Sequence, residues 1–376
     1  MAKILTYSLL LIFGLVISQF LGGFADDWIQ LGTVFCLSFI MIHIGYEFEI
    51  DKSNPKKHAW DYLVAGTAAT FPWLFCTMYF FWFLEMNSWT EALLLARFSS
   101  PTSVGILLSM LAAAGLSASW VFRKVRILAI FDDLNTILLI IPIKIMIVGI
   151  KWQLGFLVIV ILLLLWMAWR YLHSWQIPLT WPWVMFYAGL ITAISKFIYS
   201  TSMIINDMVP INLEVLLPAF VLGCMIARPA GHNPHVDDTR EGHQEGPEGS
   251  DEQQVARIVA RCFMVLVGLS MPQIPYYSIN WVIIALHVFF VTILSNLGKM
   301  FPFFCYQKEA SIRERLALSI AMFARGEVGA GKWVLVVSMG YGLGETALTV
   351  AILSLALNLL LTGVFVGAAK KLIGEN

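Results

Sequence analysis

The stretch "ARFSSPTSVGILLSM" (residues 96–110) interrupts a long apolar run with a proline and four small hydroxyl side chains. Pro101 has no backbone N–H and disfavours helical geometry at the residue before it, so we expect a helix through this run to break here, with an ordinary kink as the alternative. The neighbouring hydroxyl groups can bond to backbone groups that the break leaves free. The stretch therefore predicts two helical halves inside one apolar segment.

The rest of the chain is equally apolar. Of its 376 residues 59% are hydrophobic and 13% are charged, and the mean hydropathy is +0.79. Soluble domains carry roughly 25% charged residues, so a membrane protein is the class that fits. A formal net charge of zero argues against a nucleic-acid-binding surface. The five cysteines stand singly in apolar runs, which is typical of buried thiols and not of a metal or disulfide motif.

Apolar runs of about 20 residues recur along the whole chain and predict twelve membrane-spanning helices. The expected spans are residues 4–22, 31–49, 60–84, 89–115, 121–149, 152–172, 179–199, 208–227, 255–275, 279–306, 313–337 and 343–369. Backbone groups in lipid must be satisfied internally, so the runs predict an all-α polytopic membrane protein. The first run also resembles a signal peptide, but it is longer than the usual apolar region of about 7–15 residues, and we expect a helix.

Basic residues are unevenly distributed between the expected loops. If the N-terminus is cytoplasmic, the cytoplasmic segments hold 17 of the 24 basic residues, whereas the outer loops hold only Lys151. This asymmetry follows the positive-inside rule and predicts that both termini are cytoplasmic. The remaining basic residues fall within spans: Arg97, Lys144, Lys196, Lys299, Arg325 and Lys332.

One long loop, residues 228–254, is polar, acidic and rich in glycine and proline. This composition predicts a flexible cytoplasmic segment. His232, His235 and His243 lie near two aspartates and could bind a metal ion. Because no fixed ligand spacing supports such a site, we favour a solvated linker.

Two adjacent aspartates stand in the apolar stretch "LAIFDDLNTILL" (residues 128–139). An ionised residue at the bilayer centre costs about 2.5–3.5 kcal/mol on insertion scales, so such residues usually mark an ion or proton pathway with a partner nearby. Neighbouring residues of a helix point about 100° apart, so Asp132 and Asp133 face different surroundings. Lys299, a lone cation late in its span, is the best candidate partner. A static salt-bridge cluster is the alternative, but it leaves the second aspartate unexplained.

A second interruption is expected in "FARGEVGAGKW" (residues 323–333), where Gly326, Gly329 and Gly331 loosen the helix. It falls in span eleven and the first falls in span four, so the two spans run in opposite directions, as an inverted repeat requires. Paired interruptions of this kind mark the binding site of a transporter. We expect one transmembrane domain over residues 1–376, with repeats at 1–149 and 208–376 and linking helices at 150–200.

Four motifs resemble, in order, those of the monovalent cation:proton antiporters of the NapA and NhaA type. They are "PTSVGI" (101–106), "IFDDLN" (130–135), "LGKMF" (297–301) and "RGEVG" (325–329). The resemblance covers the whole chain. It implies an NhaA-like inverted repeat with two crossed discontinuous helices, near Pro101 and Gly326, and a homodimer in the cell inner membrane.

The resemblance also implies roles for single residues. Asp133 would be the main cation and proton site, and Asp132 would complete it while pairing with Lys299. Thr102 and Ser103 correspond to the polar residues that line the site on the first broken helix. In this family an Asp-Asp pair usually goes with electrogenic exchange.

Two further features concern the surroundings of the site. Arg325 and Glu327 correspond to an ion pair that is structural in the family. Ser100 and Pro101 replace small residues of the NapA group, and Arg97 adds a cation just before the break, so the resemblance leaves the choice of ion open.

The expected function is secondary active exchange of a monovalent cation, Na⁺ or else Li⁺ or K⁺, for protons, because cation and proton compete for one carboxylate site. We expect no enzymatic activity and no cofactor, only the transported ions, the lipid and a second copy as partners. A channel-like K⁺ efflux pathway and a sodium-coupled symporter of organic anions are the alternatives on the same fold. Lys299 beside an Asp-Asp pair argues against the symporter.

Overall fold

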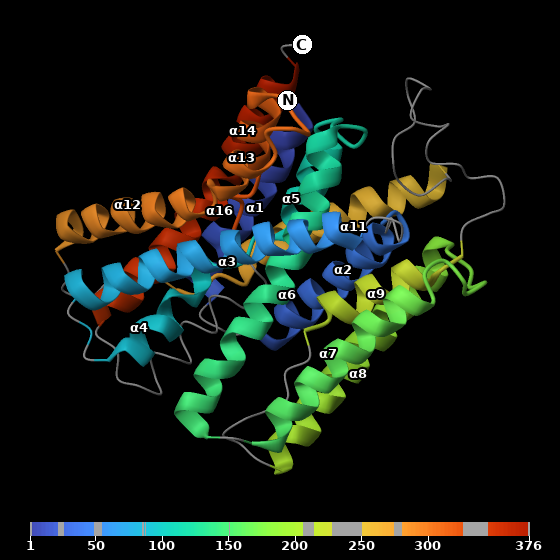
Figure 1. The fold of residues 1–376 in the computed structure, drawn as a ribbon, viewed down its shortest axis with the longest axis horizontal. Helices are drawn as coiled ribbons and strands as arrows, with labels where there is room; N and C mark the ends of the chain where they lie inside the picture. The colour runs from blue at the N-terminus through green and yellow to red at the C-terminus, as the bar shows by residue number, and fades with distance from the viewer. Residues whose placement is uncertain are drawn as a thin grey trace. The chain divides into compact units, whose positions relative to one another are not determined.

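The computed structural model describes residues 2–21, 26–48, 55–84, 86, 88–149, 151–205, 214–227, 250–273, 280–325 and 345–374. The described chain is mainly α-helical (Figure 1). It forms two compact units. The first unit comprises Met1–Gln30, Asn54–Ile143 and Met264–Asn376, and the second comprises Leu31–Ser53 and Lys144–Phe263. Both units combine segments from the two halves of the chain, so the expected repeats remain a prediction.

The first unit is a bundle of helices from both ends of the chain. Its helices are α1 (Ala2–Leu21), α3 (Pro55–Phe83), α4 (Trp89–Ala96), α5 (Val104–Ala113), most of α6 (Trp120–Val148), α12 (Trp281–Gly298), α13 (Phe301–Cys305), α14 (Ile312–Ala321) and α16 (Glu345–Gly374). α12 packs against α3 and α16. α16 also packs against α14, α1 and α5, which places it at the centre of the unit.

The second unit contains the helices from the middle of the chain together with α2. Its helices are most of α2 (Asp26–Tyr46), α7 (Trp152–Arg170), α8 (Trp181–Ile205), α9 (Leu216–Met225) and the first part of α11 (Ser250–Leu269). α9 packs against both α7 and α8. Residues 250–254, expected to belong to the flexible loop, form the first turn of α11.

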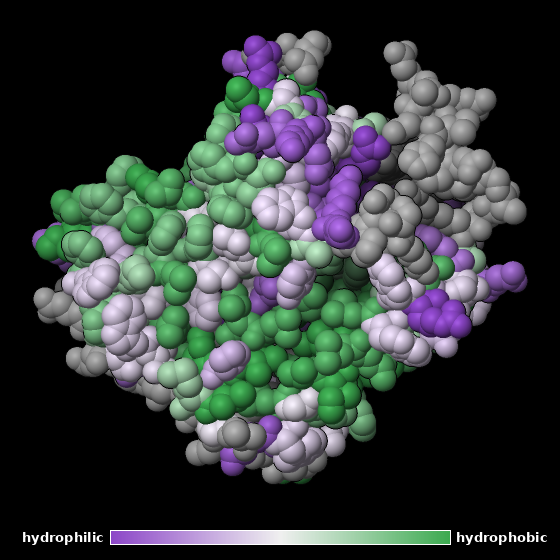
Figure 2. Space-filling view, viewed as in Figure 1, coloured by the Kyte–Doolittle hydropathy of each residue, from purple (hydrophilic) through white to green (hydrophobic). Residues whose placement is uncertain are grey.

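Among the described residues, eight helical segments are long and apolar enough to cross a membrane. They are Lys3–Leu21, Asp26–Tyr46, Lys56–Phe83, Trp89–Ala113, Trp152–Arg170, Trp181–Ile204, Trp281–Cys305 and Thr346–Gly374. Large apolar side chains such as Val282, Leu286 and Phe289 are exposed on α12, and Figure 2 shows this apolar surface. Apolar side chains that are exposed along the length of a helix are typical of contact with lipid. The chain is a multi-pass membrane protein.

The other four expected spans carry charges or reach beyond the described residues. Span 121–149 is the helix α6, which carries six ionisable residues. Span 255–275 is largely α11, which begins earlier, at Ser250. α9 covers the second part of span 208–227, and α14 covers the first part of span 313–337. The rest of these two spans includes residues outside the described ranges.

The span that contains Pro101 is interrupted where the sequence predicts. α4 ends at Ala96, a 3-10 turn follows at Arg97–Ser99, and residues 100–103 leave the helix before α5 begins at Val104. The expected break at Gly326 lies outside the described residues. However, α14 ends at Ala321, so the helix at the start of span 313–337 stops before Gly326.

A further interruption, which no pattern above predicts, divides span 279–306. α12 ends at Gly298, and the short helix α13 begins at Phe301. Pro302 stands in the first turn of α13, where a missing N–H removes no helical bond. Lys299 and Met300 form the junction, so the lysine that the sequence singles out lies at a helix end and not within a helix.

Two pairs of glycines bring helix backbones into direct contact, one pair in each unit. A Cβ on Gly14 of α1 would lie 2.2 Å from the carbonyl oxygen of Val265 on α11, and Gly268 faces Leu11 in the same way. In the second unit a Cβ on Gly45 of α2 would lie 2.2 Å from the carbonyl oxygen of Phe220, and Gly223 of α9 faces Ile42. Small residues let membrane helices approach this closely. Spans one and nine cross in one pair, and spans two and eight cross in the other.

Candidate ion-binding site

The break in span four and the segment that follows α14 in span eleven are hydrogen-bonded to each other inside the first unit. The backbone N–H of Ser103 donates to the carbonyl of Ala324 at 3.0 Å, and the Thr102 hydroxyl donates to the carbonyl of Met322 at 3.3 Å. Both contacts use backbone groups that a continuous helix would have bonded internally. The non-helical segment 100–103 and the segment after α14 therefore meet at one place.

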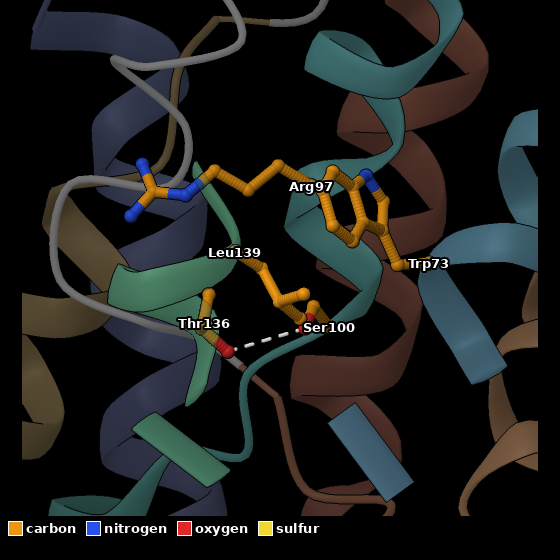
Figure 3. A pocket seen from close by; sticks show the side chains of 5 residues that line it. All are labelled: Trp73, Arg97, Ser100, Thr136 and Leu139. Atoms are coloured by element: carbon orange, nitrogen blue, oxygen red, sulfur yellow. Dashed lines mark hydrogen bonds between the residues drawn. The ribbon is translucent and has the colours of Figure 1, made fainter. Parts of the chain in front are cut away.

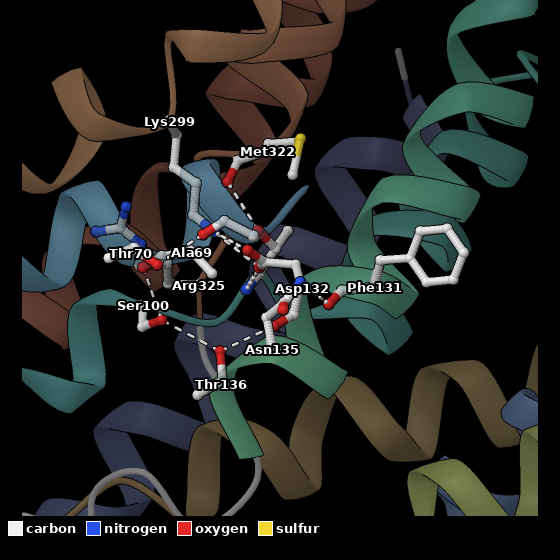
Figure 4. Close-up of polar contacts among 12 residues, drawn as sticks. Ala69, Thr70, Ser100, Phe131, Asp132, Asn135, Thr136, Lys299, Met322 and Arg325 are labelled. Atoms are coloured by element: carbon white, nitrogen blue, oxygen red, sulfur yellow. Dashed lines mark hydrogen bonds and ion pairs between the residues drawn. The ribbon is translucent and has the colours of Figure 1, made fainter. Parts of the chain in front are cut away.

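Asp132 on α6 lies beside this meeting point and is fully buried. Its Oδ2 accepts a hydrogen bond from the backbone N–H of Thr102 at 2.7 Å. Lys299 Nζ lies 2.7 Å from both Oδ1 and Oδ2 of the same carboxylate. Figure 4 shows the Lys299 side chain reaching toward Asp132. Both side chains have zero exposure, so the pair is shielded from solvent.

A close helix contact fixes the position of Lys299. A Cβ on the preceding residue, Gly298, would lie 2.4 Å from the backbone nitrogen of Pro72 on α3. Pro72 has no N–H, and glycine has no side chain, so the two backbones can touch. Lys299 follows as the C-terminal cap of α12, where a cation is favoured by the partial negative charge of the helix end.

Asp133 is also buried, with 6% of its side chain exposed. It follows Asp132 on α6, so its side chain leaves the helix about 100° further round. Lys299 lies within electrostatic range of both carboxylates. The site thus holds two carboxylates around one ammonium group.

A chain of hydroxyl contacts ties Asp132 to the break and to α3. Thr136 Oγ1 donates to the carbonyl of Asp132 at 2.9 Å and lies 3.1 Å from Ser100 Oγ. Ser100 Oγ donates to the carbonyl of Ala69 at 2.8 Å (Figure 4). Ser100, one of the small hydroxyl residues around Pro101, therefore bonds to a backbone carbonyl, as the sequence suggests. Its contacts hold α3, the break and α6 together.

A small pocket lies on the other side of these hydroxyls. It is lined by Trp73, Arg97, Ser100, Thr136 and Leu139 (Figure 3), and it is too narrow to admit a water molecule. Arg97, the extra cation noted in the sequence, lines the pocket.

The predicted pair of Arg325 and Glu327 is only partly described. Arg325 is fully buried, and its Nη2 donates to the carbonyl of Ser295 on α12 at 2.7 Å. Glu327 lies outside the described residues, so the ion pair stays a prediction. The histidines His232, His235 and His243 also lie outside the described part of the chain. Within that part, no group of three His, Cys, Asp or Glu residues is arranged to hold a metal ion.

The profile of the family described as "Sodium/hydrogen exchanger, transmembrane" matches residues 2–371, nearly the whole chain. The chain belongs to the sodium/hydrogen exchanger family. This is a family of transporters that exchange cations for protons, so exchange is favoured over the channel-like and symport alternatives. No curated protein matches the chain.

Two solved structures of a sodium/hydrogen exchanger share the fold. Both are of the sodium proton antiporter MjNhaP1 from Methanocaldococcus jannaschii. The structure at pH 8 is 16% identical and aligns over 95% of this chain and 91% of that chain, with a TM-score of 0.54. The structure from an electron-microscopy map is 17% identical and aligns over 98% and 91%, with a TM-score of 0.61. At this identity the likeness shows the fold of the exchanger.

A second buried ionic cluster has no counterpart among the residues that the sequence singles out. Asp61, Lys124 and Tyr306 are almost fully buried and contact one another, and Glu309 joins them from the surface. In the sequence, Asp61 and Lys124 stand near the ends of their spans, where charged residues are usually solvated. Tyr306, the last residue of the expected span 279–306, gives no signal in the sequence that it covers them.

Proposed function

We propose that the sodium/hydrogen exchanger described here binds its cation and its proton in turn at Asp132 and Asp133. The observation that carries the proposal is the fully buried contact between Asp132 and Lys299, at the crossing of two interrupted spans. Ionisable groups at this depth are expensive in a membrane protein and mark its transport pathway. The exchange needs no cofactor.

Asp133 is the proposed exchanging carboxylate. Two close carboxylates titrate as a coupled unit, because the negative charge of one opposes ionisation of the other. An ionised site attracts a dehydrated Na⁺ ion, and a protonated site releases it. Asp132 breaks its ion pair with Lys299 and binds the cation. The ammonium group of Lys299, no longer paired, then loses a proton. Two protons exchanged for one Na⁺ make the cycle electrogenic.

The break at Pro101 supports this site in two ways. It supplies the N–H of Thr102 to Asp132, and it places the N-terminal end of α5, which begins at Val104, beside the carboxylates. The N-terminus of a helix carries a partial positive charge that stabilises anions. Ser103 takes part in the crossing through its backbone.

The inverted repeat is proposed from the two glycine crossings. An inverted repeat would relate span one to span eight and span two to span nine. It would therefore relate the crossing of spans one and nine to a crossing of spans eight and two. Both crossings occur, and both are built from glycine pairs. Alternating access follows from movement of one group of helices against another around the fixed site. We place the exchanger in the cell inner membrane as a homodimer, with both termini cytoplasmic.

The test is an exchange assay in proteoliposomes with an imposed pH gradient. Na⁺, Li⁺ and K⁺ are added in turn, and the internal pH is followed with a dye. We expect Na⁺ to collapse the gradient, with Li⁺ next and K⁺ weakest. A collapse by K⁺ alone would make the protein a potassium/proton exchanger, and cation flux without proton movement would contradict exchange altogether.

A further inference from the structure

The buried amide of Asn135 has no part in the mechanism above. Asn135 lies on α6, three residues after Asp132 and within the apolar stretch that holds both aspartates. Asparagine is a weak helix former, and a polar side chain within a membrane helix is costly unless it has a partner or a function. The contacts of the amide show which of its two ends is already used.

The nitrogen of the amide is bonded, and the oxygen is not. Nδ2 donates to the backbone carbonyl of Phe131 at 2.8 Å, four residues earlier on α6 (Figure 4). The reverse orientation of the amide would place two acceptor oxygens together. Oδ1 has no hydrogen-bond partner among the described residues. Because a buried acceptor without a partner costs free energy, this oxygen is available for a ligand.

The bond to Phe131 also sets the direction of the amide. Residues three and four apart on a helix are neighbours, with about 5–6 Å between their Cβ atoms, and their side chains lean toward the N-terminal end of the helix. The amide of Asn135 is thus held beside the turn that carries the Asp132 carboxylate. Asn135 is 9% exposed, whereas Asp132 and Lys299 have no exposure, so a small accessible surface borders the sealed pair.

A glycine of α3 makes room for this amide. A Cβ on Gly66 would lie 3.2 Å from Nδ2 of Asn135 and 3.4 Å from its Oδ1. The first of these contacts is tight, so a larger residue at position 66 would push the amide away. The amide therefore lies between the backbone of α3 and the carbonyl of Phe131, and its oxygen has a defined place.

The charges of the site favour a neutral ligand at this place. Lys299 lies within electrostatic range of Asp132, Asp133 and Arg325. When Asp132 binds the cation and Lys299 has lost its proton, as proposed above, Na⁺ and Arg325 balance the two carboxylates. A dehydrated Na⁺ ion needs further oxygens in place of its water, and neutral carbonyl oxygens supply them in ion pathways. An amide oxygen does so without adding a charge.

We propose that Asn135 Oδ1, held in place against Gly66, is a neutral ligand of the cation that Asp132 binds. The proposal rests on the exchange proposed above and adds a residue to its site. The attraction between an ion and an oxygen rises as their distance falls, so the amide favours the smaller Na⁺ over K⁺. Asn135 thereby contributes to the choice of cation, which the two aspartates alone leave open.

Sodium binding to the purified full-length protein tests this without transport. Bound Na⁺ stabilises the folded protein by mass action, so the rise of the unfolding temperature with Na⁺ concentration gives a dissociation constant. We expect Asn135→Ala to bind Na⁺ about tenfold more weakly, with a smaller loss for K⁺. Asn358→Ala on α16 is the matched control, because its amide makes the same bond to the carbonyl four residues earlier, and it should bind Na⁺ as the wild type does. Wild-type affinity in Asn135→Ala would overturn the proposal.

Asn135→Asp separates an ion ligand from a structural amide. The variant keeps an oxygen beside Asp132 but, when ionised, has no N–H to donate to the carbonyl of Phe131. At alkaline pH, where the carboxylates are ionised, a ligand role predicts Na⁺ binding at least as tight as in the wild type, because the added negative charge attracts the ion. A structural role predicts the same loss as in Asn135→Ala, and that result would contradict the proposal.

Gly66→Ala tests the position of the amide. The new Cβ should displace Asn135 and weaken Na⁺ binding. In Asn135→Ala the smaller side chain leaves room for the methyl group, so Gly66→Ala should have little further effect there. Additive losses in the double variant would refute the placement of the amide against Gly66.

Exchange in proteoliposomes separates this proposal from the proposed function. In Asn135→Ala the KM for Na⁺ should rise about tenfold, while the rate at saturating Na⁺ stays near that of the wild type. A wild type that neither binds nor exchanges Na⁺ would refute the exchange and this proposal together. A wild type that exchanges Na⁺ with the same KM as Asn135→Ala would refute this proposal alone.

Discussion

Lys299 Nζ contacts both oxygens of the Asp132 carboxylate at 2.7 Å, and neither side chain is exposed. Lys299 is the C-terminal cap of α12 and Asp132 lies on α6, so the two residues are 167 positions apart in the chain. A buried ion pair is weak support for stability, because desolvation opposes the attraction of the charges. Its presence in a membrane protein therefore points to transport, and the surrounding structure shows how it is held.

Removing one partner of the pair should destabilise the protein. Lys299→Gln leaves Asp132 as a buried charge without its ammonium partner, and we expect a loss of about 3–5 kcal/mol in the free energy of unfolding. Asp132→Asn/Lys299→Gln leaves no buried charge at this position and should recover most of that loss. Denaturant unfolding in micelles measures both variants. Equal stability of Lys299→Gln and the wild type would show that the pair is not formed.

The same double variant should change the net charge that each exchange cycle moves across the membrane. If Lys299 supplies the second proton, Asp132→Asn/Lys299→Gln exchanges one Na⁺ for one proton at Asp133. A Na⁺ concentration jump on a supported membrane should then give a current with the wild type and none with the variant, while pH-dye exchange persists in both. A wild type that exchanges without current would contradict the electrogenic cycle.

The contact between Gly298 and Pro72 should be intolerant of a methyl group. In Gly298→Ala the new Cβ would lie 2.4 Å from the Pro72 nitrogen, so α12 must shift away from α3. We expect a loss of about 1–3 kcal/mol and slower exchange, because Lys299 moves with the helix end. Gly367→Ala on α16 is the matched control. Its Cβ meets no atom within 4 Å, so it should be neutral or stabilising. Equal effects of the two substitutions would contradict the close contact.

The fold could be predicted largely from apolar runs and local chain chemistry. Pro101 and the small hydroxyl residues around it predict the interruption before Val104. A proline alone does not decide it, because Pro72 and Pro142 stand inside α3 and α6 without ending these helices. The junction at Lys299 was not predicted, although Pro302 gives a signal for it. That signal is ambiguous, because a proline in a first turn and a proline in a kink look alike in sequence.

The candidate site was less accessible to sequence reasoning. Lys299 is a lone cation in a span, which favours it as a partner, and the structure places it against Asp132. The role of Thr102 differs in detail, because its amide and not its hydroxyl meets the carboxylate. Lys124 shows what sequence reasoning cannot supply. A lysine near a helix start is normally solvated, but this one is buried and contacts Asp61, Tyr306 and Glu309.

The measurement that tests the central claim most directly is Na⁺-driven proton movement by Asp133→Asn in proteoliposomes. The exposed Asp27→Asn is reconstituted in parallel as the control. Asparagine keeps the shape of the side chain but cannot ionise, so cation and proton have nothing to exchange. We predict no exchange by Asp133→Asn and wild-type exchange by Asp27→Asn. Exchange by Asp133→Asn at the wild-type rate would contradict the assignment of Asp133 as the exchanging carboxylate.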